Sequence, residues 1–279
     1  MASGPSIKST ALATVEGGIS STASVTSRLF DLSRRRALIT GASQGLGYTL
    51  ARGLAQHGAT VIMNARNVGR LEEAVQRLRA DGLSAHALSF DVTDPVAAQI
   101  GVDHAESEFG PIDILVNNAG MQHRAPLDQF PLDQWDAMMR TNVSSLFYVS
   151  KPVAMRMITR GRGKIINIAS VQSELARPGI APYAATKGAV RNLTRGMATD
   201  WARHGLQINA IAPGYFRTEL TQSLVDNPEF TQWLSQRTPA GRWGDPTELI
   251  GAAVFLASDA SSFVNGHTLF VDGGMTASV

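Results

Sequence analysis

Three side chains in the second half of the chain could together move a proton. Tyr183 and Lys187 are separated by three residues in the segment Y-A-A-T-K, and Ser170 ends the apolar run K-I-I-N-I-A-S upstream of them. Residues four positions apart share a helix face, so the Lys187 ammonium can lie beside the Tyr183 phenol. A phenol has a reference pKa of about 10, and a neighbouring positive charge favours its ionised form. The spacing therefore predicts Tyr183 as a general acid and base, with Ser170 as a further polar residue of the same site.

A glycine-rich turn lies where the first strand-like run passes into a helix-like one, and it reads T-G-A-S-Q-G-L-G at residues 40–47. Glycines let the backbone approach a pyrophosphate, and the helix N-terminus beyond them offers N–H groups and the positive end of a dipole. The spacing is G-x-x-x-G-x-G instead of the standard G-x-G-x-x-G, so a tight turn without a ligand is the alternative. The turn predicts a dinucleotide site with contacts from Gly41, Ser43, Gln44, Gly45, Leu46 and Gly47.

The end of the second predicted strand indicates which dinucleotide binds. An NAD site places an acidic residue there, which accepts from the ribose 2′-hydroxyl. Here the strand ends V-I-M-N-A-R, with Ala65 at the expected acidic position and Arg66 after it. A guanidinium can pair with a 2′-phosphate, which predicts NADP(H); a solvated surface arginine is the alternative. Residues that end the third and fourth strands could meet the adenine and nicotinamide sides of the cofactor: Asp91 and Val92, then Asn118, Ala119 and Gly120.

Strand-like and helix-like stretches alternate along the chain. This pattern predicts an α/β fold, a doubly wound (Rossmann-type) parallel seven-stranded sheet with helices on both faces. The expected strands are 36–40, 59–65, 85–90, 112–117, 164–169, 206–212 and 268–271. The expected helices are 46–57, 69–81, 95–109, 132–159, 182–204 and 246–258.

Local signals refine this outline at two places. Pro95 and Pro246 suit the first turns of helices, where Asp94 and Asp245 could act as caps. Residues 213–243 break the alternation with glycines, prolines and several aromatic side chains. The segment predicts either a lid over the active site or a long loop packed by its own aromatic residues.

The composition limits the classes of protein to which the chain can belong. A length of 279 residues is ordinary for one doubly wound sheet, and we expect a single domain at residues 28–279. No uncharged apolar run reaches about eighteen residues, so no membrane partner is expected. A net charge of +2 without a basic tract gives no reason to expect a nucleic-acid partner. The absence of cysteine excludes disulfides and thiolate metal sites, and the six histidines are scattered, so no metal is expected.

The first 27 residues differ from the rest of the chain. They are rich in serine, threonine, glycine and alanine, with Lys8 and Glu16 as their charged side chains. Such a segment predicts a flexible N-terminal extension. It also has the serine-rich, acid-poor character of a transit peptide but lacks the arginines, so we expect a cytoplasmic location, with targeting as the alternative.

Taken together, these motifs resemble the short-chain dehydrogenase/reductase family. The shared residues are T-G-A-S-Q-G-L-G, N-N-A-G at 117–120, Asn142, Ser170, Tyr183 with Lys187, and Pro213-Gly214. The resemblance implies a catalytic tetrad of Asn142, Ser170, Tyr183 and Lys187. It also implies cofactor contacts from Pro213, Gly214, Tyr183 and Lys187, a water-linked proton path at Asn142, and a homo-oligomer, usually a tetramer. Gln44 departs from NADP-preferring members, which often have a basic residue there, so the 2′-phosphate prediction rests on Arg66.

Several stretches resemble one branch of this family, the gluconate 5-dehydrogenases: M-Q-H-R at 121–124, V-Q-S-E-L-A-R at 171–177, A-P-G-Y-F-R-T-E-L at 212–220 and N-G-H-T-L-F-V-D-G-G-M at 265–275. This resemblance implies a hydride transfer between NADP(H) and a sugar acid, D-gluconate or 5-dehydro-D-gluconate. Such a substrate needs a cation for its carboxylate and polar groups for its hydroxyls. Arg124 is the candidate cation, unless it is a surface arginine. Gln172 and Glu174 are candidates for the hydroxyls, unless Glu174 pairs with an arginine.

Two other functions stay open at this point. A 3-oxoacyl-carrier-protein reductase would share the tetrad and the NADP preference, and Arg140, Arg191 and Arg195 could offer its acidic carrier a basic surface. A catalytically silent dinucleotide sensor would share the fold, but it would have no need of the proton donor Tyr183.

Overall fold

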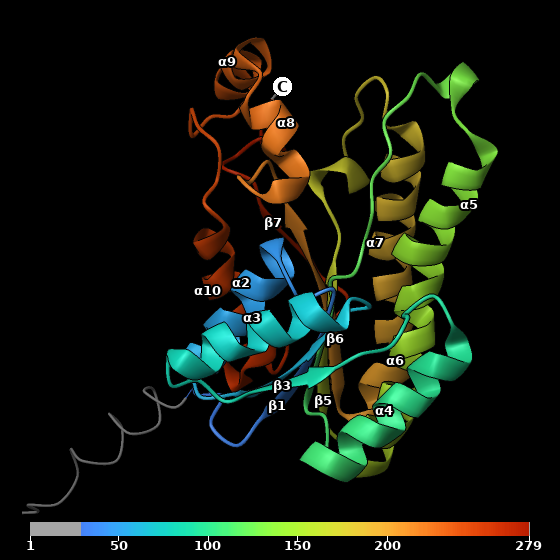
Figure 1. Cartoon of the computed structure of the whole chain (residues 1–279), viewed down its shortest axis with the longest axis vertical. Helices are drawn as coiled ribbons and strands as arrows, with labels where there is room; N and C mark the ends of the chain where they lie inside the picture. The colour runs from blue at the N-terminus through green and yellow to red at the C-terminus, as the bar shows by residue number, and fades with distance from the viewer. Residues whose placement is uncertain (1–28, 279) are drawn as a thin grey trace, which may run out of the picture.

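Seven parallel strands form one sheet in the order β3-β2-β1-β4-β5-β6-β7 (Figure 1). The computed structural model describes residues 29–278, so the predicted extension at residues 1–27 lies outside the described part of the chain. The strands are β1 Arg36–Thr40, β2 Thr60–Asn64, β3 Ala85–Leu88, β4 Ile114–Asn117, β5 Gly163–Ile168, β6 Leu206–Pro213 and β7 Thr268–Val271. Each predicted strand is present, with its ends within two residues of the predicted ones, and the doubly wound fold class is confirmed.

Helices cover both faces of this sheet (Figure 1). The longer ones are α2 Gly45–Gln56, α3 Val68–Ala80, α4 Pro95–Phe109, α5 Leu132–Met139, α6 Ser145–Arg160, α7 Ala181–Trp201, α9 Pro228–Arg237 and α10 Ile250–Ala257. Helices α2, α3 and α10 share one buried apolar cluster on one face of the sheet, and α4, α6 and α7 share another on the opposite face. Alternate residues of each strand feed the two clusters: Ile39 belongs to the first and Leu38 to the second. A central strand that is buried on both faces is mainly apolar, as Ala37–Ile39 of β1 and Ile114–Val116 of β4 are.

The chain reverses its direction of winding between β1 and β4. Strand β1 pairs with β2 on one side and with β4 on the other, so the loops that follow β1 and β4 diverge to opposite faces. In open α/β sheets, ligands bind in the crevice that this reversal creates at the carboxyl ends of the strands. The glycine turn after β1 and the N-N-A-G segment at the end of β4 both lie at this edge.

The predicted helix caps are present. Asp94 accepts hydrogen bonds from the N–H groups of Val96 and Ala97 at the start of α4, with Pro95 in the first turn. Asp245 forms a capping box with Glu248 at a 3-10 turn, Pro246–Leu249, that leads into α10. The predicted long helix at 132–159 differs in its middle, because a π-helical turn, Arg140–Ser144, joins α5 to α6. Such π turns occur frequently at functional sites, and this one carries Asn142.

Residues 213–243 contain more regular structure than predicted. They form a 3-10 turn, Glu219–Thr221, the short helix α8 Gln222–Val225, and α9. Their aromatic side chains form a cluster in which the Tyr215 ring lies 5.6 Å from Phe230 and 5.9 Å from Trp243, between ring centroids. The segment packs on its own aromatic side chains, as the loop alternative predicted, and it also lines the cavity described below.

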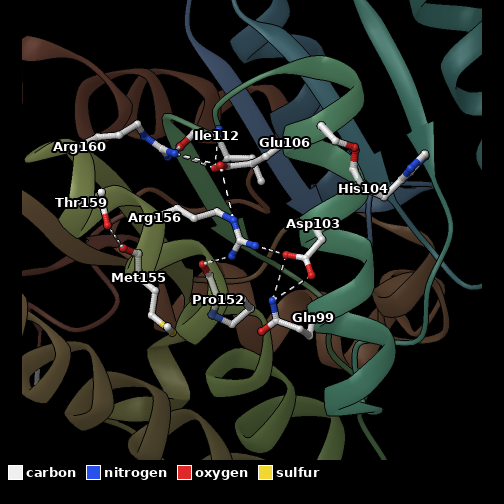
Figure 2. A network of polar contacts seen from close by, with 11 residues as sticks. Gln99, Asp103, His104, Glu106, Ile112, Pro152, Met155, Arg156, Thr159 and Arg160 are labelled. Atoms are coloured by element: carbon white, nitrogen blue, oxygen red, sulfur yellow. Dashed lines mark hydrogen bonds and ion pairs between the residues drawn. The ribbon is translucent and has the colours of Figure 1, made fainter.

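A partly buried ionic network fixes α4 against α6 (Figure 2). Figure 2 shows Arg156 and Arg160 of α6 extending toward Asp103 and Glu106 of α4. Arg160 Nη1 donates to both Glu106 carboxylate oxygens at 3.0 Å, and its Nη2 donates to the Ile112 carbonyl at 2.7 Å. Glu106 in turn accepts from the Ile112 N–H at 3.0 Å. The network thus holds the loop that feeds β4 as well as the two helices.

Removing Arg160 should therefore destabilise the protein. We expect Arg160→Ala to cost about 1–3 kcal/mol, because the Glu106 carboxylate and the Ile112 carbonyl lose their partner in a partly buried place. For a chain of this size the melting temperature should fall by roughly 3–10 °C. Arg52→Ala is the matched control, since its ion pair with Asp81 leaves both side chains about half exposed, at 47% and 48%, and exposed pairs contribute about 0–1 kcal/mol. Equal shifts in the two variants, measured by thermal unfolding, would contradict the role of the network.

Candidate active site

One cavity of about 830 Å³ opens at the carboxyl edge of the sheet and extends from the glycine turn to the predicted proton donor. Every residue predicted to contact the cofactor lines it, as do Ser170, Tyr183, Lys187, Arg124 and Gln172. Asn142 and Glu174 are not among its lining residues. The fold therefore brings together residues that lie more than 170 positions apart along the chain.

The glycine turn fits a pyrophosphate. Gly41 has a φ of +63°, which an L side chain rarely adopts. A Cβ on Gly47 would lie 2.3 Å from the Gly41 carbonyl oxygen, so the start of α2 can approach the turn only without a side chain there. Helix α2 begins with neither a side-chain cap from Gln44 nor an acidic residue in its first turn. Its first N–H groups and the positive end of its dipole are thus available to an anion.

Asn118 ties this turn to the end of β4. Its side-chain Nδ2 donates to the carbonyl oxygens of Thr40 and Gly41, each at 3.0 Å. The Thr40 hydroxyl accepts from the N–H groups of Asn118 and Ala119 at 3.0 and 3.1 Å. Both walls of the crevice are therefore held by hydrogen bonds before any ligand enters.

Arg66 lies at the outer end of the cavity, where an adenosine 2′-phosphate would be expected. Its side chain is 73% exposed, and its Nη1 lies 3.8 Å from the Asp91 carboxylate. Burial acts to raise the pKa of the Asp91 carboxyl, but hydrogen bonds from Thr93 and the Arg66 charge outweigh it, so this pKa lies below its usual value. Arg70, which sequence reasoning missed, lines the same cavity from the first turn of α3. Its place in the first turn of the helix that follows the Arg66 strand end is the signal that could have identified it.

Tyr183, Lys187 and Ser170 meet where α7 begins beside the end of β5. The Lys187 ammonium donates to the Ile168 carbonyl at 2.7 Å and lies 5.6 Å from the centroid of the Tyr183 ring. Lys187 is buried, and burial lowers the pKa of its ammonium to about 8. The Ser170 hydroxyl lies close enough to the Tyr183 phenol to lower the pKa of that phenol. The predicted contact of the three side chains is therefore present.

The protonation of Tyr183 differs from the simplest expectation. Burial raises the pKa of the phenol to about 12, while the Ser170 hydroxyl and the Arg124 charge act to lower it. The predicted lowering of the phenol pKa by Lys187 is wrong for the protein alone, because desolvation penalises the phenolate more than nearby charges favour it. The side chain is thus held as a neutral phenol, which is the form that can donate a proton.

Asn142 organises the loop after β4 instead of facing the cavity. Its side-chain oxygen accepts from the Met121 N–H at 2.8 Å, and its Nδ2 donates to the Met121 carbonyl at 2.9 Å and to the Thr186 hydroxyl at 3.1 Å. A Cβ on Gly120 would lie 3.4 Å from the Asn142 oxygen and 4.0 Å from the Lys187 nitrogen. Asn142 and the Lys187 ammonium therefore both lie close to Gly120, and Asn142 links the π turn to the predicted nicotinamide wall.

Two of the three residues predicted to contact the substrate line the cavity, and the third does not. Arg124 and Gln172 line the cavity, whereas the Glu174 carboxylate forms an ion pair with Arg191 of α7. The structural pairing of Glu174 with an arginine, named above as the alternative, is the one observed, so its predicted contact with substrate hydroxyls is corrected. Two further lining residues, Arg177 and Tyr215, were not predicted as site residues. Each lies within a quoted motif, but only the fold shows that the two motifs meet.

Among residues 29–278, no cluster of three or more histidine, aspartate or glutamate side chains could hold a metal ion. Within the same range, no helix combines the length and the apolar character needed to cross a membrane.

Known proteins resemble this chain in both sequence and fold. The model of a family described as enoyl-(acyl carrier protein) reductase matches residues 41–276. A gluconate 5-dehydrogenase of Gluconobacter oxydans (strain 621H) is 63% identical over 251 residues, which cover 90% of this chain and 98% of that protein. A 5-keto-D-gluconate 5-reductase of Escherichia coli (strain K12) is 53% identical over 90% of this chain and 99% of its own length.

A solved structure agrees with these matches. The crystal structure of a gluconate 5-dehydrogenase from Burkholderia cenocepacia J2315, in complex with NADP and tartrate, is 58% identical and has a TM-score of 0.88, covering 90% of this chain and 98% of its own. The motifs, the sheet order, the family model and these relatives agree: the chain belongs to the short-chain dehydrogenase/reductase family.

Proposed function

We propose that this chain catalyses the NADP(H)-dependent interconversion of D-gluconate and 5-dehydro-D-gluconate. The observation that carries the proposal is the single cavity that joins the glycine turn, the Tyr183 phenol and the Arg124 guanidinium. The names of the relatives that are 63% and 53% identical support the same substrate. Tartrate, in the complex of the Burkholderia protein, is itself a hydroxy acid.

Each part of the cavity would hold one part of the cofactor. The glycine turn and the start of α2 would hold the pyrophosphate, Arg66 and Arg70 the 2′-phosphate, and Lys187 the nicotinamide ribose. NADP(H), when bound, supplies or accepts the hydride, which neither the phenol nor the ammonium can do. The charge of Arg66, together with the absence of an acidic residue at Ala65, favours NADPH over NADH.

Proton transfer would be the work of Tyr183. In the reductive direction the neutral phenol donates its proton to the substrate oxygen, and the Ser170 hydroxyl hydrogen-bonds the same oxygen as charge develops on it. The phenolate that remains is stabilised by the Lys187 ammonium, which the Ile168 carbonyl holds in place. In the oxidative direction the Tyr183 phenolate takes the proton from the 5-hydroxyl of the substrate.

The carrier-protein reductase stays as the second candidate because the matching family model carries an acyl-carrier-protein description. Arg140 and Arg195 are exposed, as a docking surface would need, but Arg191 is engaged by Glu174.

NADPH consumption with 5-dehydro-D-gluconate, run beside an acetoacetyl thioester, separates the two candidate functions. Fast turnover of the sugar acid with little turnover of the thioester is the expected result, and the reverse would transfer the function to the carrier-protein reductase. NADPH binding without turnover of either substrate would favour the sensor.

A homotetramer in the cytoplasm, as predicted from the sequence, is also part of the proposal. Large apolar side chains are exposed on α5 and α6, among them Leu132 at 81% and Met155 at 59%. Such apolar patches often mark an interface with another chain, which supports the association of copies through these helices. The cytoplasmic location rests on the sequence alone.

Tyr183→Phe should abolish turnover and leave cofactor binding intact. The loss of the proton donor is expected to lower kcat by about 10²- to 10⁴-fold, the usual contribution of general acid catalysis. NADPH affinity, measured by the change in nicotinamide fluorescence, should stay within about twofold because the ring and its packing are kept. Residual activity within about tenfold of the native enzyme would remove Tyr183 from this role.

The rate of reduction should depend on the charge of Lys187. Because burial lowers the pKa of this ammonium to about 8, the positive form is complete at pH 6 and disappears as the pH rises through 8. We expect kcat for reduction to be constant at low pH and to fall above pH 8. Lys187→Arg, whose guanidinium stays charged, should abolish that fall at the cost of a lower overall rate. A fall at the same pH in this variant would assign the titration to another group.

Arg66→Ala should weaken NADPH binding selectively. We expect KM for NADPH to rise roughly tenfold, through the loss of one charge-assisted contact with the 2′-phosphate, and KM for NADH to change little. Arg77→Ala is the matched control, because Arg77 belongs to the same helix as Arg70 but does not line the cavity and lies over the Tyr48 ring. Equal effects on the two cofactors would refute the role of Arg66.

A further inference from the structure

The substrate end of the cavity contains a second guanidinium, Arg177, close to that of Arg124. Burial and the positive charge of Arg177 both lower the pKa of the Arg124 guanidinium. Neither arginine forms an ion pair with any carboxylate among residues 29–278. Two like charges held close together repel each other, and an anion that binds both relieves this repulsion.

The acidic residues of the cavity lie elsewhere. Asp91 pairs with Arg66 at the outer end. The Glu219 carboxylate lies beside the glycine turn, 3.4 Å from the position that a Cβ on Gly45 would take. The substrate end is therefore positively charged without compensation from the described residues that line it.

Tyr215 fixes the orientation of Arg177. Arg177 Nε donates to the Tyr215 phenol oxygen at 3.1 Å, and its guanidinium carbon lies 5.4 Å from the centroid of the Phe230 ring. The Tyr215 ring is itself held in the aromatic cluster with Phe230, Trp233 and Trp243. Only Nε of this guanidinium is bonded within the described residues, so both terminal nitrogens retain their donors. A planar guanidinium anchored at Nε can offer these donors to a carboxylate.

Gln172 adds a second unmet hydrogen-bonding group to the same wall. Its Nε2 donates to the Tyr215 oxygen at 3.3 Å. Its Oε1 is buried and has no partner in the described part of the chain, and the residue as a whole is 7% exposed. Buried acceptors are almost always paired in folded proteins, so this oxygen lacks a donor that a ligand hydroxyl would supply.

We propose that Arg177, positioned by Tyr215, determines substrate specificity by binding the carboxylate of the sugar acid together with Arg124, while Gln172 Oε1 accepts a hydrogen bond from a substrate hydroxyl. The inference rests on the proposed function, because it names the groups that recognise the substrate at that site. A carboxylate has two oxygens and can accept from two guanidiniums at once. The anion removes the repulsion between the two cations, so a neutral polyol or an acyl thioester gains nothing comparable.

The test compares two substrates that differ at one carbon. L-Sorbose is 5-dehydro-D-gluconate with a hydroxymethyl group in place of the carboxylate, so it presents the same ketone without the charge. In Arg177→Gln we expect KM for 5-dehydro-D-gluconate to rise about 10- to 100-fold, with kcat kept within about threefold and kcat/KM for L-sorbose nearly unchanged. Tyr215→Phe should shift KM in the same direction but less, because the cation is kept and only its anchor is lost.

Arg217→Gln is the matched control, since Arg217 is an exposed arginine of the same segment that does not line the cavity. Equal losses for both substrates in Arg177→Gln would make Arg177 a structural residue, and an unchanged preference between them would overturn the proposal.

A second measurement does not need turnover: calorimetric titration of D-gluconate into the NADPH-saturated enzyme. Weaker binding in Arg177→Gln than in the Arg217→Gln control supports the carboxylate site even if another sugar acid proves to be the physiological substrate. Absence of gluconate binding to the native enzyme, or equal binding in both variants, contradicts it.

Discussion

The parallel pairing of β1 with β4, and the hydrogen bonds between their ends, are the constraint on which the site depends. Asn118 donates two hydrogen bonds to Thr40 across the two strand ends, one from its backbone N–H and one from its side-chain amide, and a Cβ on Gly47 would collide with the Gly41 carbonyl. The parallel pairing of β1 and β4 places these groups at one edge, and the reversal of winding opens the crevice there. The cofactor wall is thus a consequence of backbone packing and needs few dedicated side chains.

A buried polar network extends this order to the catalytic side. Asn117 donates to the Ser150 hydroxyl at 2.8 Å and to the Asn167 side-chain oxygen at 2.9 Å, and Asn167 donates to the Thr194 hydroxyl at 2.9 Å. These bonds join β4, β5, α6 and α7 beneath the cavity. A satisfied network of this kind fixes one arrangement of its elements, so α7 presents Tyr183 and Lys187 at a set height over the end of β5. Burial there disfavours the charged form of both groups, so it raises the pKa of the Tyr183 phenol and lowers the pKa of the Lys187 ammonium.

The sequence was sufficient where a function depends on local spacing. The four-residue separation of Tyr183 and Lys187 is enough to place them on one helix face. Asp94 and Asp245 could be predicted as N-caps from their residue type and the proline that follows each. It was insufficient where a role depends on which distant segments meet. Glu174 has the chemistry of a hydroxyl ligand, but the turn after Ser170 places it against Arg191. Arg177 belongs to the same motif but lines the cavity, where Tyr215, two residues after the end of β6, accepts a hydrogen bond from its Nε. The π turn at Asn142 has no signal in the periodicity, since its neighbours on both sides are ordinary helix.

The charges of the cavity bear on what the protein can discriminate. Positive side chains stand at both ends, Arg66 and Arg70 near the expected 2′-phosphate and Arg124 and Arg177 near the expected carboxylate, with the neutral phenol of Tyr183 between. This distribution favours an anionic cofactor and an anionic substrate. Both members of the proposed substrate pair, D-gluconate and 5-dehydro-D-gluconate, carry the same carboxylate, so the proposed arginine site would bind both and would add nothing to the difference between them. An interaction that is equal in two states leaves their equilibrium unchanged. The fixed charges therefore select the class of substrate, and the direction of the reaction follows the concentrations of the sugar acids and of the two forms of the cofactor.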